Sequence, residues 1–313
     1  MVGIIAHAPV DVVLEADYAF LASFGLARHE CTTMTRDSRA ALAEAVEAMP
    51  RVVLPGGCGA NMASWLARLG SETRVVAPFG KDSNGSMARR DLEARGIHIA
   101  GFDYDGPHTL ITPDRERTFA AWYHGVRYDI LESARQLRGE REVIIDGYLL
   151  FQPGVTDGLR AWLAERPGGQ KIVFCPGDVS VLTEMADDAR FVLDHSDHLI
   201  MNRNEAAYLY PGLSSEAAAA ELRARGVSGA ITEGEKGALL FDASETLHIG
   251  PGSLGEPVVN TNGAGDAFTA GYVHGLDRGL SLAETAQLAT SCAAEILMTH
   301  GARPEQVTDE VMA

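Results

Sequence analysis

The chain has 313 residues, of which 46% are hydrophobic and 22% are charged. This length supports a full hydrophobic core, and we expect one large α/β domain over residues 1–313 rather than two small domains. Lys and Arg number 26 and Asp and Glu number 43, so the net charge of −17 repels phosphate backbones and we expect no nucleic-acid partner.

The cysteines and the N-terminal residues indicate where the protein works. The four cysteines are widely spaced without a Cys-x-x-Cys pair, which argues against a zinc site or a disulfide framework and indicates reduced thiols in the cytoplasm. Residues 1–6 are apolar but have no basic leader, so they predict a first buried strand rather than a signal peptide. No apolar run approaches the roughly 20 residues that span a bilayer, so we expect no membrane partner.

Short β-rich runs alternate along the chain with segments that carry apolar residues on one face at helical spacing. The predicted strands are residues 73–77, 142–146, 171–175, 198–202 and 229–233. The predicted helices are residues 60–69, 83–95, 155–165 and 214–225. This alternation predicts a mostly parallel central sheet with helices on both faces.

Two segments, at about 11–35 and 97–123, interrupt this alternation. The second contains two β-rich runs around Pro113-Asp114-Arg115-Glu116, which predicts a hairpin. An extra small sheet of this kind can form a lid that excludes water from a reactive group. The alternative is an edge decoration without a role.

The segment from Asn260 to Phe268 is the most informative part of the chain, since a short apolar strand is predicted before it at 257–259 and a helix after it at 267–276. Gly263 and Gly265 permit a tight turn, and the uncapped N–H groups at the helix start attract an anion. Asp266 then lies where a proton can be removed. The alternative is an ordinary helix start with an N-cap, and the segment fits neither a Walker A loop nor a Rossmann fingerprint.

A second glycine cluster runs from Gly56 to Asn61 and precedes a predicted helix. Paired glycines usually mark a loop, so the cluster alone is weak support for a site. Asn61 lies at the helix start, where it either caps the helix or binds a hydroxyl group of a ligand.

Two further motifs follow predicted strands, namely Asn202-x-x-Glu205 and Thr232-x-Gly234-x-x-Gly237. Parallel strands end at one edge of a sheet, so we expect Asn202, Glu205, Thr232 and Asp266 to gather there. Glu205 is the best candidate for holding a divalent cation, with a solvated carboxylate at a helix start as the alternative. Gly234 and Gly237 would let a nucleotide approach the backbone, with a plain hairpin turn as the alternative.

The motifs, taken together, resemble those of the PfkB, or ribokinase-like, family of sugar and nucleoside kinases. They appear in the family's order and cover nearly the whole chain, from Asp11 to about Gly301: Gly56-Gly57 to Asn61, Gly80-x-Asp82-x-x-Gly85, Asn202-x-x-Glu205, Thr232-x-Gly234-x-x-Gly237 and Gly263-Ala264-Gly265-Asp266. The resemblance implies a ribokinase-like fold with a small β lid, the use of ATP and Mg²⁺, and a homodimer through the lid.

The resemblance also implies a role for each motif. Asp266 is implied as the general base, and the backbone N–H groups of Gly263, Ala264 and Gly265 as the anion hole for the γ-phosphate. The residues implied in substrate binding are Asp11, Gly56, Gly57 and Asn61. The residues implied in ATP binding are Asn202, Thr232, Gly234 and Gly237, while Glu205 organises Mg²⁺ through water.

Three positions depart from the family pattern. Asn260 stands where members usually carry Asp, which leaves open whether a monovalent cation binds nearby. His7 follows the first strand in place of a small residue or Asn, and it is either a solvated turn histidine or a substrate contact. Cys58 stands where ribokinases tend to carry lysine, which argues against ribose as the substrate.

The sequence therefore predicts a kinase that transfers the γ-phosphate of ATP to a primary hydroxyl group of a furanose sugar or a nucleoside. The segment 261–266 resembles adenosine kinases, whereas residues 56–61 followed by Ala67-Arg68-Leu69-Gly70 resemble sugar kinases. Two alternatives stay open: a nucleotide-binding regulator of the same fold without turnover, and a vitamin kinase of the same superfamily.

Overall fold

The computed structural model describes residues 1–14, 16–27, 31–100, 102–103, 108–111, 118–121, 128–259, 261–299 and 301–304. Its centre is a nine-stranded sheet of order β16-β15-β14-β13-β12-β11-β1-β5-β7. These strands are β1 (Val2–Ile5), β5 (Thr73–Val76), β7 (His98–Ile99), β11 (Glu142–Asp146), β12 (Lys171–Cys175), β13 (His198–Asn202), β14 (Ser228–Thr232), β15 (Ala238–Phe241) and β16 (Thr246–Ile249). Neighbours from β14 to β7 are parallel, and β15 and β16 extend the sheet antiparallel.

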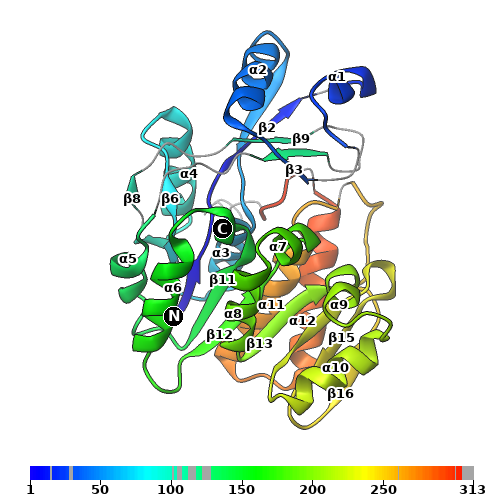
Figure 1. Cartoon of the computed structure of the whole chain (residues 1–313). Coiled ribbons are helices and arrows are strands. Elements are labelled where there is room, and N and C mark those ends of the chain that lie inside the picture. The colour runs from blue at the N-terminus through cyan, green and yellow to red at the C-terminus, as the bar shows by residue number, and fades with distance from the viewer. Residues whose placement is uncertain are drawn as a thin grey trace, which may run out of the picture.

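Helices cover both faces of this sheet (Figure 1). Successive residues of a strand point to opposite sides, so the apolar residues of each strand form a core on both faces. On β11, Val143 and Ile145 join one core cluster and Ile144 joins the other. The first cluster includes residues of α5 (Leu131–Arg135), α6 (Val155–Glu165), α7 (Val179–Glu184), α8 (Ala186–Asp194), α9 (Arg203–Leu209) and α10 (Ser215–Ala224). The second includes residues of α3 (Cys58–Arg68), α4 (Ser83–Ala94), α11 (Ala264–Arg278) and α12 (Leu282–Leu297).

The predicted α/β class with a mostly parallel sheet is confirmed. The strands predicted at 142–146, 171–175 and 198–202 have the predicted bounds, and so does the helix at 155–165. The strand predicted at 257–259 is wrong. The N–H of Val259 donates instead to the carbonyl oxygen of Leu297 over 2.7 Å, so the segment runs along the end of α12 and pairs with no strand among the described residues.

A second sheet of five strands has the order β3-β10-β9-β2-β4. Its strands are β2 (Val10–Leu14), β3 (Cys31–Thr33), β4 (Arg51–Pro55), β9 (His108–Ile111) and β10 (Phe119–Ala121). The predicted hairpin is confirmed by the antiparallel pairing of β9 with β10, and the turn at 112–117 lies outside the described residues. β4 belongs to this sheet although it falls outside the two interrupting segments, while β7 within 97–123 belongs to the main sheet.

The second sheet has one covered face and one open face. Leu14 packs with residues of α1 (Tyr18–Ser23) and α2 (Arg36–Glu47), and Val12 lies against the same cluster. Val52 and Leu54 pair with Val13 and Asp11, so they lie on the opposite face, where they are 57% and 41% exposed. Figure 1 shows this sheet above the main sheet, beyond the carboxyl ends of its parallel strands.

A separate two-stranded sheet joins β6 (Pro78–Phe79) to β8 (Phe102–Asp103), and two 3₁₀ helices follow strands, η1 (Gly147–Phe151) and η2 (Gly234–Lys236). Among the helices that the structure describes, none combines the length and apolar character needed to cross a lipid bilayer.

Candidate active site

The polar residues predicted to gather at one sheet edge are delivered there by the strand ends. Asn202 ends β13 and Thr232 ends β14, and the two are directly paired in register. β11, which is separated from β13 by β12, ends at Asp146. This is the edge at which open α/β sheets bind ligands.

The helix α11 begins with a turn that only glycine can make. Gly263 is its N-cap and has φ of 76°, and a Cβ atom there would lie 2.6 Å from the carbonyl oxygen of Ala302. Gly265 is exposed, and a Cβ atom there would meet nothing within 4 Å. The first turn of α11 therefore presents its backbone N–H groups and the positive end of the helix dipole at an open position, where they attract an anion.

Asp266 lies in the first turn of α11 and is half-buried. Its Oδ2 accepts a hydrogen bond of 2.8 Å from Nδ2 of Asn61, which lies on α3 and is 205 residues away in the chain. Gly57, not Asn61, is the N-cap of α3, so capping does not explain the buried Asn61 side chain. The two glycine motifs thus meet through one amide–carboxylate contact.

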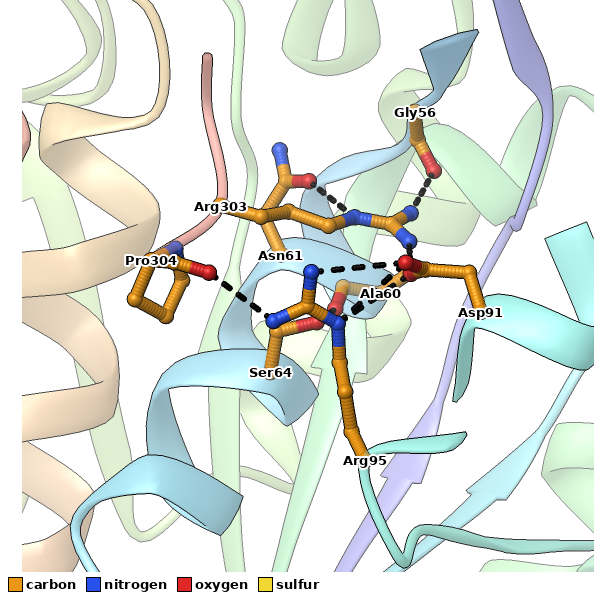
Figure 2. Close-up of polar contacts among 8 residues, drawn as sticks. All are labelled: Gly56, Ala60, Asn61, Ser64, Asp91, Arg95, Arg303 and Pro304. Atoms are coloured by element: carbon orange, nitrogen blue, oxygen red, sulfur yellow. Dashed lines mark hydrogen bonds and ion pairs between the residues drawn. The ribbon is translucent and has the colours of Figure 1, made fainter. Parts of the chain in front are cut away.

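A third residue, Arg303, completes this contact from the C-terminal segment (Figure 2). Its Nε donates to Oδ1 of Asn61 over 3.0 Å and its second terminal nitrogen donates to the carbonyl oxygen of Gly56 over 2.6 Å. Its remaining nitrogen forms an ion pair with Asp91, which also pairs with Arg95. Sequence reasoning missed Arg303, since it lies in none of the motifs and a single charged residue gives no signal of burial.

Asp11 lies on β2 and turns toward the same place. A Cβ atom on Gly56 would lie 2.4 Å from the carboxyl carbon of Asp11, so the glycine makes room for this side chain. Burial raises the pKa of Asp11 to about 7, while the positive charge of Arg303 lowers it and the charge of Asp266 raises it. Asp11, Asn61 and Asp266 are therefore brought together from three elements.

The other glycines of the first cluster bring α3 against the end of β1. Gly57 has φ of 92°, and a Cβ atom there would lie 2.6 Å from the carbonyl oxygen of His7. A Cβ atom on Gly59 would lie 2.0 Å from Cβ of Ala6. His7 itself is 5% exposed, so the solvated turn histidine considered from the sequence is wrong.

Asp146 is a second residue that sequence reasoning missed, since it was read only as the end of a strand. Its buried carboxylate accepts the N–H groups of His7 over 3.4 Å, Gly59 over 3.3 Å and Tyr148 over 3.1 Å. Burial raises its pKa to about 7, and the charge of Asp266 adds to the increase. Asp146 thus ties the end of β1 to α3 beside Asp266.

Glu205 is the third residue of α9 and forms a capping box with Asn202, and its Oε2 accepts the N–H of Asn202 over 2.7 Å. The side chain is only 2% exposed, so it caps the helix but is not solvated. Burial raises its pKa to about 8, which the N–H of Asn202 opposes and the charge of Asp178 reinforces. Its Oε1 has no hydrogen-bond partner among the described residues.

A carboxylate oxygen without a hydrogen-bond partner can accept a hydrogen bond from a water molecule bound to Mg²⁺, since this ion usually keeps several waters. Among the residues that the structure describes, no group of three or more His, Cys, Asp or Glu side chains could hold a metal ion directly. The unpartnered Oε1 of Glu205 fits a role through water. Asn260, the position on which a monovalent-cation site depends, lies outside the described part of the chain.

The segment from Thr232 to Gly237 is a hairpin turn, since η2 joins β14 to the antiparallel β15. Gly237 has φ of 89°, and a Cβ atom there would lie 2.0 Å from the carbonyl oxygen of Ile249 on the neighbouring strand β16, so the fold itself requires this glycine. Gly234 has φ of 63°, and a Cβ atom there would meet nothing within 4 Å. The turn thus leaves open space at Gly234, next to the end of β14.

The model of the pfkB family of carbohydrate kinases matches residues 19–309. A ribokinase of Bacillus subtilis (strain 168) is 27% identical over 279 residues, which are 86% of this chain and 90% of that protein. A probable chloroplastic fructokinase-6 of Arabidopsis thaliana is 27% identical over 286 residues, or 82% of this chain and 73% of that protein. The crystal structure of adenosine kinase from Sinorhizobium meliloti is similar with a TM-score of 0.83 and 25% identity, over 97% of this chain and 95% of that one.

Proposed function

The chain belongs to the pfkB family of carbohydrate kinases, and on this premise we propose that it transfers the γ-phosphate of ATP to a primary hydroxyl group of a furanose sugar or a nucleoside. It is a phosphotransferase with an alcohol group as acceptor. The observation that carries the proposal is the contact of Asp266 with Asn61 at the glycine turn of α11. There a carboxylate and the anion-attracting end of a helix lie within one turn of each other.

In the proposed reaction, Asp266 accepts the proton of the substrate hydroxyl as its oxygen bonds to the γ-phosphorus, and the bond from that phosphorus to the bridging oxygen of ADP breaks. The backbone N–H groups of Gly263, Ala264 and Gly265 face the negative charge on the phosphoryl oxygens. The exposed position of Gly265 supports this role, since a phosphate can approach the backbone there.

Asp11, Gly56, Gly57 and Asn61 are proposed to bind the substrate. Asp11 and Asn61 present acceptor and donor groups that suit sugar hydroxyls. Asn61 is buried and Asp11 is half-buried, so polar partners that replace water are favoured there. The two glycines place these side chains, Gly56 by giving room to Asp11 and Gly57 by turning the chain into α3. The arrangement supports recognition of a polyhydroxylated molecule.

Asn202, Thr232, Gly234 and Gly237 are proposed to line the ATP site, at the neighbouring strand ends. Glu205 is proposed to hold Mg²⁺ through water with its unpartnered Oε1. Bound Mg²⁺ would neutralise charge on the phosphates. The open space at Gly234 supports an approach of the nucleotide to the backbone.

The second sheet is proposed to act as a lid over this site. Asp11 lies on its open face, the same face that carries Val52 and Leu54. Closing that face onto the site would remove water from around Asp266 and bury apolar side chains at the same time. A homodimer through this sheet remains a prediction, which light scattering on the purified protein checks.

A panel of furanose sugars and nucleosides, incubated with ATP and Mg²⁺, tests the proposal. We expect ADP release with at least one substrate, and a product that mass spectrometry identifies as phosphorylated at the primary hydroxyl group. The matched control is the same substrate with that hydroxyl replaced by hydrogen, which should give no product. Absence of transfer to every member of the panel, or equal transfer to the deoxy control, would contradict the proposal.

A further inference from the structure

We infer that Arg303 is a positioning residue for the phosphoryl transfer, which acts by fixing the side-chain amide of Asn61 so that its NH₂ group faces Asp266. The inference rests on the proposed function, because it assigns Asp266 the part of the base. It adds a residue that lies outside all of the motifs. Figure 2 shows Arg303 between Asn61, Gly56 and Asp91.

The direction of the Asn61 amide follows from hydrogen-bond chemistry. A guanidinium group only donates, so Nε of Arg303, at 3.0 Å, requires the amide oxygen of Asn61 on its side. The amide NH₂ group is then left for Asp266, whose Oδ2 lies at 2.8 Å and can only accept when ionised. Arg303, Asn61 and Asp266 therefore form a chain in which each contact orients the next.

Arg303 is itself held rigidly. Its side chain is 7% exposed, and it reaches three fixed partners, namely the carboxylate of Asp91 on α4, the carbonyl oxygen of Gly56 and the amide of Asn61. A buried charge stays charged when it is paired and hydrogen-bonded, and removing it leaves the partner uncompensated. The planar guanidinium can satisfy all three directions at once, which a lysine ammonium on its flexible chain does less well.

The segment that carries Arg303 also contacts the other half of the site. Ala302 packs so closely on Gly263 that any side chain there would collide with its backbone. Residues 301–304 thus contact the N-cap of α11 through Ala302 and Asn61 of α3 through Arg303. One short segment fixes the distance between the anion-attracting turn and the residue that orients the base.

Loss of Arg303 frees the Asn61 amide to rotate, so its NH₂ group is no longer held toward the carboxylate of Asp266. A carboxylate that loses a fixed hydrogen-bond donor and a nearby positive charge is easier to protonate. Among the described residues, the titratable groups whose pKa values respond to the charge of Asp266 include Asp11 on β2, Asp146 on β11 and Cys175 on β12, and all three pKa values are raised. None of them replaces the lost positive charge, so the ionised base should become less populated at neutral pH.

The kinetic test compares Arg303→Met and Arg303→Lys with the matched control Arg95→Met. Arg95 pairs with the same Asp91 and donates to the carbonyl oxygen of Pro304 over 2.9 Å, but no contact to Asn61 is found for it among the described residues. We expect kcat to fall about 10- to 100-fold in Arg303→Met, with the acid limb of the kcat profile moved about one unit to higher pH. Arg303→Lys should have an intermediate kcat. Arg95→Met should keep the wild-type acid limb of the kcat profile and a kcat within about twofold of the wild type.

A double-mutant cycle with Asn61→Ala shows whether Arg303 acts through Asn61. If it does, Arg303→Met lowers kcat far less in the Asn61→Ala background than in the wild type. An equal loss of kcat in both backgrounds would overturn the inference. An Arg303→Met enzyme whose kcat and acid limb are unchanged would also overturn it. If Arg303→Met does not fold, Arg303→Lys carries the same cycle.

A readout without turnover separates this inference from the proposed function. In protein labelled with ¹³C at the aspartate carboxyl carbons, the Asp266 signal is assigned by its loss in Asp266→Asn. Its titration midpoint should move to higher pH in Arg303→Met and stay in place in Arg95→Met. An unmoved midpoint overturns the inference even if the kinase activity stands, and a moved midpoint upholds the Arg303–Asn61–Asp266 chain even if no sugar or nucleoside is phosphorylated.

Discussion

At the residue scale, the carboxylates Asp146, Glu205 and Asp266 differ in what surrounds them. Asp266 is half-buried at the start of a helix, whereas Asp146 and Glu205 are almost fully buried. Burial raises the pKa values of the latter two to about 7 and about 8. A group that changes its protonation between the folded and unfolded states makes stability depend on pH.

Asp146 gives a measurable case. Its ordinary pKa of 3.8 is raised to about 7 in the folded protein, so between these values the folded state binds a proton that the unfolded state has lost. The free energy of unfolding should therefore fall as pH rises through this window, and the loss is complete above about 7. Between pH 5 and pH 8 the contribution of this single group is on the order of 2 kcal/mol.

Asp146→Asn removes this titration. Chemical denaturation of both proteins at pH 5 and pH 8 should show a smaller loss of unfolding free energy in the variant than in the wild type. Each protein is compared with itself at the two pH values. A pH-independent cost of placing an amide beside the N–H groups of His7 and Gly59 therefore cancels. Equal losses in the two proteins would show that Asp146 is ionised in the folded state throughout.

At the scale of elements, α11 has a glycine with positive φ at each end. Gly263 is its N-cap with φ of 76°, and Gly279 is its C-cap with φ of 66°. A Cβ atom on Gly263 would collide with the backbone of Ala302, whereas one on Gly279 would meet nothing within 4 Å. Replacing either glycine by alanine therefore strains the backbone, but only the substitution at Gly263 also causes a collision with Ala302.

Gly263→Ala should lower the unfolding free energy by about 2–3 kcal/mol and kcat at least tenfold, because residues 301–304 must move away from α11. Gly279→Ala is the matched control, with an expected cost of about 1 kcal/mol from strain alone and a kcat within about twofold of the wild type. Denaturation and steady-state kinetics on the two variants measure both effects. A Gly263→Ala enzyme with unchanged kcat would mean that the close contact with Ala302 does not position the site.

At the scale of the whole molecule, the main sheet was predictable because its strands are buried on both faces. The runs 142–146 and 171–175 are nearly continuous apolar segments bounded by polar or turn residues, which is typical of parallel strands. Because parallel strands end at one edge, the sequence predicts Asn202, Glu205, Thr232 and Asp266 there. The structure pairs Asn202 with Thr232 and caps α9 with Asn202 and Glu205, while Asp266 contacts Asn61 of α3.

The parts that were missed depend on contacts between distant segments. β4 lies at the edge of the second sheet and is apolar on both faces, since Val52 and Leu54 are exposed and Val53 is half-buried. Its sequence therefore lacks the apolar–polar alternation that marks a strand. Arg303 lies 242 residues from Asn61, and only tertiary packing buries it. The segment 257–259 has an apolar sequence typical of a strand, but its N–H bond goes to the end of α12.

The site thus depends on the convergence of both sheets and the C-terminal segment on Asp266, which is proposed to remove the proton of the substrate hydroxyl. Replacing this carboxylate by an amide of the same shape leaves the helix start and its N–H groups in place but removes the base.

The most direct measurement is kcat of Asp266→Asn with the best substrate, together with its Kd for ATP. The proposed role predicts a kcat at least about 100-fold below the wild type, since a general base contributes about 10²- to 10⁴-fold, and an ATP Kd within about twofold. A variant that turns over at the wild-type rate would contradict the assignment of Asp266 as the base.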